Sequence, residues 1–284
     1  MLSLAGGSLS HGNHPLSESS NGPHGGADHR STRSNSCAPS LPPSSRDTAN
    51  VDATVSVRLT DGRMVRGEAP TFLGHLTRDD LRPVREPGVH KDQKHIPAYF
   101  WMSQLRELVW YESRLEMMCL KQLDFGIPLI GVLPQPFILY YTSKGRRHWH
   151  TPDFLVWCTD GSRLLVNVKP VRHVAAPHNQ RAFRACLDLA QYLNWSYSTQ
   201  SEPPPVLRAN INWLAGYRRR PPGFELYATT LVERSSYKPT IAQLLAGVGP
   251  PPFVLPVFFH LLWKRQIEFD HDVLLTSESK VWLT

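Results

Sequence analysis

The stretch HTPDFLVWCTDGSRLLVNVKP, residues 150–170, contains two apolar segments that the sequence predicts as paired β-strands. Asp153 opens the first segment, residues 154–158, and Asp160-Gly161 supplies the signal for a tight turn. The second segment, residues 164–169, ends in Asn-Val-Lys. The predicted hairpin therefore sets a carboxylate at the mouth of one arm, beside an amide and an ammonium group at the end of the other.

The end of the second arm offers groups that suit a divalent cation and a phosphodiester. Asn167 supplies an amide oxygen, and Val168 a backbone carbonyl beside it. Together with the carboxylate of Asp153, these are the hard oxygen ligands that Mg²⁺ prefers. Lys169 lies two residues beyond Asn167 and hence on the same strand face, where its ammonium would orient an attacking water. The hairpin therefore predicts a metal site for phosphodiester hydrolysis.

A third acidic group is expected from a preceding helix. Glu112 and Glu116 lie one helical turn apart within residues 101–123, whose apolar spacing predicts one long amphipathic helix. Each site residue also has a structural explanation, because turn aspartates, strand-end lysines and helix-surface glutamates are common. The combined spacing, rather than any single residue, favours a nuclease.

Further segments extend this pattern along the chain. They are YESRLE at 111–116, LDF at 123–125, QPF at 135–137, TPDFLV at 151–156, VNVKP at 166–170, ANINWLAGYR at 209–218 and HLLW at 260–263. In this order they resemble the TnsA-type endonuclease subunit of heteromeric transposases. That subunit belongs to the PD-(D/E)xK, restriction-endonuclease-like superfamily, and the likeness covers most of residues 90–284.

The resemblance implies roles for individual residues. The catalytic positions fall on Glu116, Asp153 and Lys169. The metal ligands would be Glu116, Asp153, Asn167 and Val168, and the supporting residues Glu112 and Gln135. The implied cofactor is Mg²⁺, for which Mn²⁺ would substitute. Asn167 occupies a position where the family has a carboxylate or Gln, so the second metal ligand differs here.

The resemblance also implies a reaction and its partners. The chain would hydrolyse the 5′ strand at the ends of transposon DNA, working beside a DDE-type transposase subunit (TnsB-like) and an ATP-dependent regulator (TnsC-like). Two alternatives stay open. One is a stand-alone restriction or repair nuclease of the same fold, and the other is a DNA-binding or assembly module whose site has weakened through Asn167.

The expected fold class is α/β, with a restriction-endonuclease-like core in which helices flank a mixed sheet. Residues 1–50, rich in Ser, Gly, Pro, Asn and His, are predicted to be a disordered tail. Residues 51–98 form an N-terminal extension with a short hairpin, and 99–220 the nuclease core. Residues 221–284 form a C-terminal helical, winged-helix-like or partner-docking unit.

Local patterns predict the remaining elements. Residues 67–98 read as irregular. The other predicted elements are strands at 137–141, 146–150 and 195–198, helices at 178–193, 206–217 and 241–245, a helix ending near 267, and a strand pair closing at 282.

The charge of the chain fits a polyanionic partner. Lys and Arg number 31 against 24 Asp and Glu, a formal net charge of +7, although a solvated basic surface has the same composition. The predicted DNA contacts are Lys144, Arg146, Arg147, His148, Arg172 and Arg181. His148 and His150 alternate as a zinc pair would, but no third ligand follows at the usual spacing, so DNA contact or solvation is favoured.

The expected compartment is the cytoplasm. The longest apolar stretch, residues 253–263, is shorter than the roughly 20 residues of a membrane span. The first residues lack the features of a signal peptide. Cys119, Cys158 and Cys186 lie in apolar contexts, which favours reduced core thiols over disulfides or a zinc site.

Overall fold

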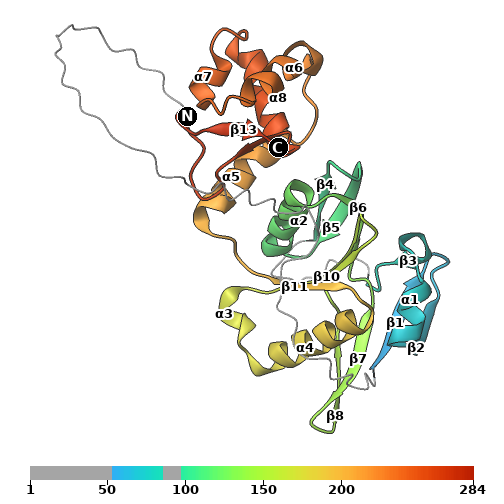
Figure 1. The fold of residues 1–284 in the computed structure, drawn as a ribbon. Helices are drawn as coiled ribbons and strands as arrows, with labels where there is room; N and C mark the ends of the chain where they lie inside the picture. The colour runs from blue at the N-terminus through green and yellow to red at the C-terminus, as the bar shows by residue number, and fades with distance from the viewer. Residues whose placement is uncertain (1–52, 86–96) are drawn as a thin grey trace, which may run out of the picture. The chain divides into compact units, whose positions relative to one another are not determined.

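The computed structural model of the chain describes residues 53–85 and 97–284 (Figure 1). Within them the fold is mixed α/β, with thirteen β-strands, eight α-helices and two short 3₁₀ helices. The predicted α/β class is therefore confirmed. The predicted disordered tail, residues 1–50, lies outside the described residues.

The predicted hairpin is present at the centre of a four-stranded sheet. In sheet order the strands are β11 (Ser196–Gln200), β10 (Arg163–Val168), β9 (Phe154–Cys158) and β6 (Leu129–Pro134). Strands β9 and β10 are antiparallel, with Val166 opposite Phe154, and Gly161 takes a left-handed φ of 81° in their turn. Strand β11 runs parallel to β10. The hairpin that carries the candidate site is thus an interior part of the sheet.

The central sheet is buried on both faces, which explains why its strands read as continuous apolar runs. Alternate residues such as Val156 and Val166 join one core with helix α2 (Arg114–Gly126). The hairpin of β4 (Ala98–Met102) and β5 (Glu107–Tyr111) completes that core. The intervening residues, such as Leu155 and Leu165, join a second core with helix α4 (Pro177–Tyr192). A short helix, α3 (Val171–Val174), connects β10 to α4.

A second sheet, of five strands, packs into the same core as α4. Its order is β2 (Met64–Glu68), β1 (Ala53–Leu59), β7 (Ile138–Ser143) and β8 (Arg146–His150), with β3 (Leu81–Arg82) pairing on β1. Val55 lies opposite Leu139, so the first strand joins β7 directly (Figure 1). Helix α1 (Ala69–His75) and a 3₁₀ turn (Arg78–Asp80) connect β2 to β3. The predicted N-terminal hairpin is confirmed as β1 and β2.

The C-terminal residues form a mainly helical unit closed by a two-stranded ribbon. Its elements are α5 (Pro205–Leu214), a 3₁₀ turn (Ala215–Tyr217), α6 (Phe224–Ser235), α7 (Ile241–Leu245), α8 (Pro251–Trp263), β12 (Ile267–Phe269) and β13 (Val281–Leu283). Their apolar side chains form a third core that also includes Met118 and Phe125 of α2. The indole Nε1–H of Trp263 donates to the Ser103 hydroxyl at 3.0 Å. These contacts anchor the unit on α2.

The predicted helix over residues 101–123 is wrong in its first half. Residues 98–111 instead form the β4–β5 hairpin, whose turn includes Arg106 with a left-handed φ of 56°. The helix begins only after Ser113, whose Oγ accepts the Glu116 N–H at 3.1 Å. The prediction failed because short apolar spacings fit the period of a helix as well as that of a strand. The aromatic residues in β4 and β5 favour strands.

Two other expectations need correction. Residues 67–98 are less irregular than expected, because α1 and β3 form within them. Strand β6 was not anticipated, since Gly131 and the flanking prolines obscure its pattern. The predicted strand at 137–141 exists as β7, but it pairs in the five-stranded sheet and β6 takes its place beside β9. The domain boundaries at 98 and 220 stay predictions, although β1 pairs with β7 across the first.

The structure bears on two further predictions, that the cysteines are reduced core thiols and that the chain has no membrane span. Cys119 and Cys186 are buried and free, as expected. Cys158 is not among the free thiols, so the expectation is not confirmed for it. Within residues 53–85 and 97–284, none of the helices combines the length and apolarity needed to cross a membrane.

The shared core of the two sheets gives a stability prediction. Leu139 of β7 is fully buried against both sheets, so Leu139→Ala should lower the free energy of unfolding by about 2–5 kcal/mol. Met64 on β2 is half exposed, and Met64→Ala should change it by no more than about 0.5 kcal/mol. Urea denaturation of both variants measures the difference. Equal effects would contradict a single core joining the sheets.

Candidate active site

Asp153 lies where β9 begins and β10 ends, held there from both sides. Its Oδ2 accepts the Val168 N–H at 2.6 Å, and its own N–H donates to the Val166 carbonyl at 3.0 Å. Burial, followed by repulsion from Glu116, raises the pKa of the Asp153 carboxyl from 3.8 to about 7. A carboxyl group held so far from its ordinary pKa is a mark of a functional site, though structural networks also produce it.

Glu116 lies in the first turn of α2 and its carboxylate is bonded to the start of that helix. Oε2 accepts the Glu112 N–H at 2.9 Å, and Oε1 accepts the Ser113 hydroxyl at 2.8 Å. Burial raises the pKa of Glu116 despite these two bonds. The residue is thus a helix cap by geometry, and each oxygen keeps a second lone pair for another ligand.

The charges of Glu116 and Lys169 both act on Asp153, so the three predicted catalytic residues lie within electrostatic reach of one another. Burial raises the pKa of both Asp153 and Glu116, and the Lys169 ammonium offsets part of that rise in each. The charge of Glu116 adds to the rise at Asp153, and that of Glu112 to the rise at Glu116. Lys169 is anchored by its backbone, since its N–H donates to the Gln200 carbonyl at 2.9 Å and its carbonyl accepts the Ser201 hydroxyl at 2.7 Å. Helix α2 and the β9–β10 hairpin therefore contribute acidic and basic groups within electrostatic reach.

The supporting residues Glu112 and Gln135 are linked by an arginine that the sequence analysis did not select. Arg85 Nε donates to Gln135 Oε1 at 2.8 Å, and its Nη2 lies 3.7 Å from Glu112 Oε2. Gln135 is buried, has a left-handed φ of 44°, and donates its N–H to the Asp153 carbonyl at 2.8 Å. This residue, in a sparsely populated backbone conformation, ties Arg85 to the mouth of the hairpin.

Asn167 faces a buried polar network. Its side chain is fully buried, its Nδ2 donates to the Tyr197 hydroxyl at 2.9 Å, and its Oδ1 lies 2.7 Å from His150 Nε2. An amide oxygen cannot donate, so His150 Nε2 carries the proton in this contact. The Tyr197 hydroxyl continues to Thr199 at 3.0 Å. Both polar atoms of Asn167 are thus engaged, and its role as a metal ligand stays a prediction.

The negative charge of the candidate site suits a divalent cation, but the described side chains do not supply a full set of metal ligands. Asp153 and Glu116 repel each other in a buried place, and a nearby cation would relieve that repulsion. Among the described residues, no group of three or more His, Cys, Asp and Glu is arranged to hold a metal ion. Two carboxylates with backbone oxygens and water, the Val168 carbonyl included, are the set that Mg²⁺ would use.

The predicted DNA contacts fall into two groups. Lys144, Arg146 and Arg147 are exposed at the β7–β8 hairpin, where His148 stacks on Tyr141 with ring centroids 5.5 Å apart. Burial raises the pKa of the Tyr141 phenol, and the charge of Arg181 on α4 offsets part of that rise. Arg172 lies apart on α3, where its charge acts on Glu202. Lys144, Arg146, Arg147 and His148 thus share the β7–β8 hairpin, whereas Arg172 lies on another element.

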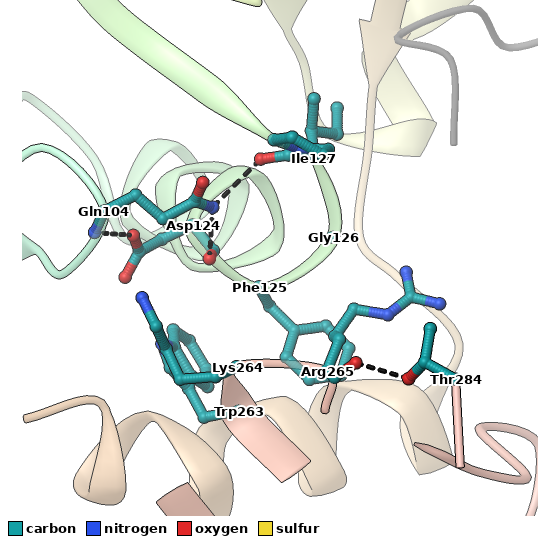
Figure 2. Close-up of a pocket in the computed structure, with 10 residues that line it drawn as sticks. Gln104, Asp124, Phe125, Gly126, Ile127, Trp263, Lys264, Arg265 and Thr284 are labelled. Atoms are coloured by element: carbon teal, nitrogen blue, oxygen red, sulfur yellow. Dashed lines mark hydrogen bonds between the residues drawn. The ribbon is translucent and has the colours of Figure 1, made fainter. Parts of the chain in front are cut away.

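A pocket of about 250 Å³ lies away from these residues (Figure 2). It is lined by the end of α2 and the residues after α8, including Asp124 and Arg265. The Asp124 carboxylate accepts the backbone N–H groups of Ser103 and Gln104 at 2.9 and 3.0 Å. The Gln104 amide donates to the carbonyls of Asp124 and Ile127. These bonds are structural, and none of the predicted site residues lines the pocket.

Comparison with known proteins adds no assignment. No protein-family model matches this chain, and no curated protein matches it significantly.

Several residues around the candidate site were not predicted from the sequence. Ser113 had a visible signal, because Ser-x-x-Glu is the pattern of a helix N-terminus, with Glu116 as its acidic member. His150 was considered as half of a zinc pair, as a DNA contact or as a solvated residue, and not as a partner of Asn167. Arg85 and Tyr197 carried no local signal, since their contacts connect residues that lie 50 and 30 positions apart.

The raised pKa of Asp153 predicts a cost in stability at high pH. Its shift from 3.8 to about 7 corresponds to at most roughly 4 kcal/mol, and partial exposure of the side chain should reduce this to about 1–3 kcal/mol. The unfolded carboxyl ionises first, so this penalty grows as pH rises from 4 towards 7. Asp153→Asn in metal-free buffer should therefore stabilise the protein at pH 8, and less at pH 5. Urea denaturation at both pH values measures this, and equal changes would contradict it.

The contact between His150 and Asn167 predicts a shift in titration. Burial lowers the pKa of His150 below 6.5, so the protein should lose stability as pH falls below that value. Asn167→Asp would place a carboxylate beside the imidazole and raise its pKa. Titration of the imidazole proton resonances by NMR tests this, with exposed His178 as an internal control. An unchanged His150 pKa in the variant would contradict the contact.

Proposed function

We propose that this chain is a metal-dependent DNA endonuclease of the PD-(D/E)xK class, and the 5′-strand-cleaving subunit of a heteromeric cut-and-paste transposase. The observation that carries the proposal is the position of Asp153, whose carboxylate accepts the Val168 N–H at 2.6 Å in a place where the charges of Glu116 and Lys169 both act on it. Two buried carboxylates beside one ammonium make a suitable arrangement for metal-assisted phosphodiester hydrolysis. The resemblance to TnsA-type subunits supplies the narrower assignment.

The order of elements supports a restriction-endonuclease-like core. Helix α2 precedes strand β6 and the β9–β10 hairpin, and helix α4 then leads to β11, parallel to β10. The sequence predicted the order helix, three strands, helix, strand, with residues 137–141 as the first strand. In the structure the unpredicted β6 is the first core strand instead, and β7 and β8 lie between β6 and β9 along the chain. The two helices pack in different cores, which is consistent with one on each face of the sheet.

The chemistry assigned to the residues follows from their charges. Asp153 and Glu116 would hold the divalent ion, which when bound supplies charge relief to the scissile phosphodiester. Lys169 would orient the attacking water and offset negative charge that develops on the phosphate. The basic β7–β8 hairpin would bind the DNA backbone without reading its sequence. Cleavage would take one hydrolytic step with no covalent intermediate.

The burial of Asn167 favours one alternative, a weakened site in a DNA-binding or assembly module. The amide has no exposed surface and both polar atoms are bonded, so it offers little to a metal ion. Calorimetry with Mg²⁺ and Mn²⁺ in the presence of DNA separates the two functions. Metal binding lost in Asp153→Ala supports the nuclease, whereas no binding by the wild type alongside intact DNA binding supports the module.

The proposal predicts loss of strand cleavage in two variants. Asp153→Ala and Lys169→Ala should each reduce Mg²⁺-dependent nicking of transposon-end DNA by about 100-fold or more, measured with the transposase partner present. Asp160→Ala, which removes an exposed carboxylate from the turn of the same hairpin, should nick like the wild type. Full activity in both site variants would defeat the assignment.

The partner requirement separates a transposase subunit from a stand-alone nuclease. The wild-type chain alone should cut little, and cleavage should rise when the transposase subunit and regulator are added. Equal cutting with and without them would favour a restriction or repair enzyme of the same fold.

A further inference from the structure

We propose that Arg85 is a phosphate-binding residue of this site, released from Glu112 when a DNA phosphodiester arrives. The inference rests on the proposed nuclease function and adds a residue to it. Arg85 follows β3, outside the helix and hairpin that carry the predicted catalytic groups. It reaches the site through two contacts, one to Gln135 and one to Glu112.

The contact with Gln135 fixes where the guanidinium lies. The Gln135 side-chain oxygen accepts from Arg85 Nε at 2.8 Å, and its backbone carbonyl accepts the Val84 N–H at 3.0 Å. The Gln135 N–H in turn donates to the carbonyl of Asp153 at 2.8 Å. One buried residue in a left-handed conformation thus connects the base of Arg85 to the residue that carries the candidate catalytic carboxylate.

The contact with Glu112 does not account for Arg85 as a stabilising residue. The Nη2 to Oε2 distance is 3.7 Å, and the side chains are 54% and 35% exposed. Exposed ion pairs of this length contribute little to stability. The outer nitrogens of Arg85 have no hydrogen-bond acceptor within 3.5 Å among the described residues, which leaves donors for the oxygens of an anion.

The negative charge of the site exceeds what the Lys169 ammonium can neutralise. Three carboxylates, Glu112, Glu116 and Asp153, lie within electrostatic reach of one another, and Glu116 accepts the Glu112 N–H at 2.9 Å. The Lys169 charge offsets part of this negative charge at Asp153 and Glu116. A phosphodiester approaching that cluster would be repelled. With Arg85 included and a divalent ion bound, fully ionised groups would leave one positive charge, which matches the single negative charge of a phosphodiester. Any anion that binds Arg85 must first displace the Glu112 carboxylate, and this lowers the affinity of the site for anions other than the DNA phosphate.

The test measures DNA binding by the full chain in Ca²⁺, which supports binding without requiring cleavage. A fluorescein-labelled DNA duplex serves as probe, and anisotropy is recorded over a range of salt concentrations. Arg85→Ala should weaken binding about tenfold and reduce the slope of log affinity against log salt by about 0.9, the value of one phosphate contact. Arg85→Lys should keep the slope and recover part of the affinity.

The matched control is Arg63→Ala, which removes an exposed arginine paired with Asp61 at 2.6 Å in the β1–β2 turn. This variant should keep the wild-type slope. Glu112→Gln should tighten DNA binding in the wild-type background and have a smaller effect in the Arg85→Ala background.

Failure of this inference is distinguishable from failure of the proposed function. Wild-type affinity and slope in Arg85→Ala would overturn the phosphate contact alone, if Asp153→Ala and Lys169→Ala still lose nicking. Undiminished nicking in those two variants would overturn the nuclease while the slope still reports the contact. A wild-type chain that binds no duplex would overturn both.

Discussion

The 2.6 Å bond from the Val168 N–H to the Asp153 carboxylate joins the entrance of β9 to the exit of β10. It satisfies a backbone donor at the point where the strands cease to pair, and it holds a carboxyl group where burial opposes its ionisation. Helix α2 then brings Glu116 close enough to oppose that ionisation further. Two acidic groups that raise the cost of each other's ionisation are a mark of a functional site.

The Ser113–Glu116 cap shows how one residue can serve both structure and site. Capping bonds hold the Glu116 side chain at the first turn of α2. Its conformational entropy is therefore already lost in the folded protein, and little more would be lost when a ligand binds. The same turn begins directly after β5, so the β4–β5 hairpin sets where the helix starts. Preorganisation of the acidic group thus follows from local sequence, while its distance from Asp153 follows from packing against the sheet.

Local patterns predicted the hairpin at 154–168, helix α4, strand β11 and much of the C-terminal unit, because these elements have clear periodicity and turn residues. They failed for residues 101–111, where the apolar spacing fitted both a helix and a strand, and for β6, where Gly131 must be small because Arg78 crosses it. Glu116, Asp153 and Lys169 were predicted from spacing. Arg85 and Tyr197 were not, because only tertiary structure brings them to their partners.

The pairing of β1 with β7 has a consequence for how the chain folds. Val55 and Leu139 are partners across more than eighty positions, whereas the other edge of β1 pairs locally with β2. Pairings of such high contact order are slow to form. Until β7 pairs, one edge of β1 stays exposed and unpaired, a condition that invites aggregation. A fragment of this protein that contains β1 but ends before β7 would keep this edge exposed.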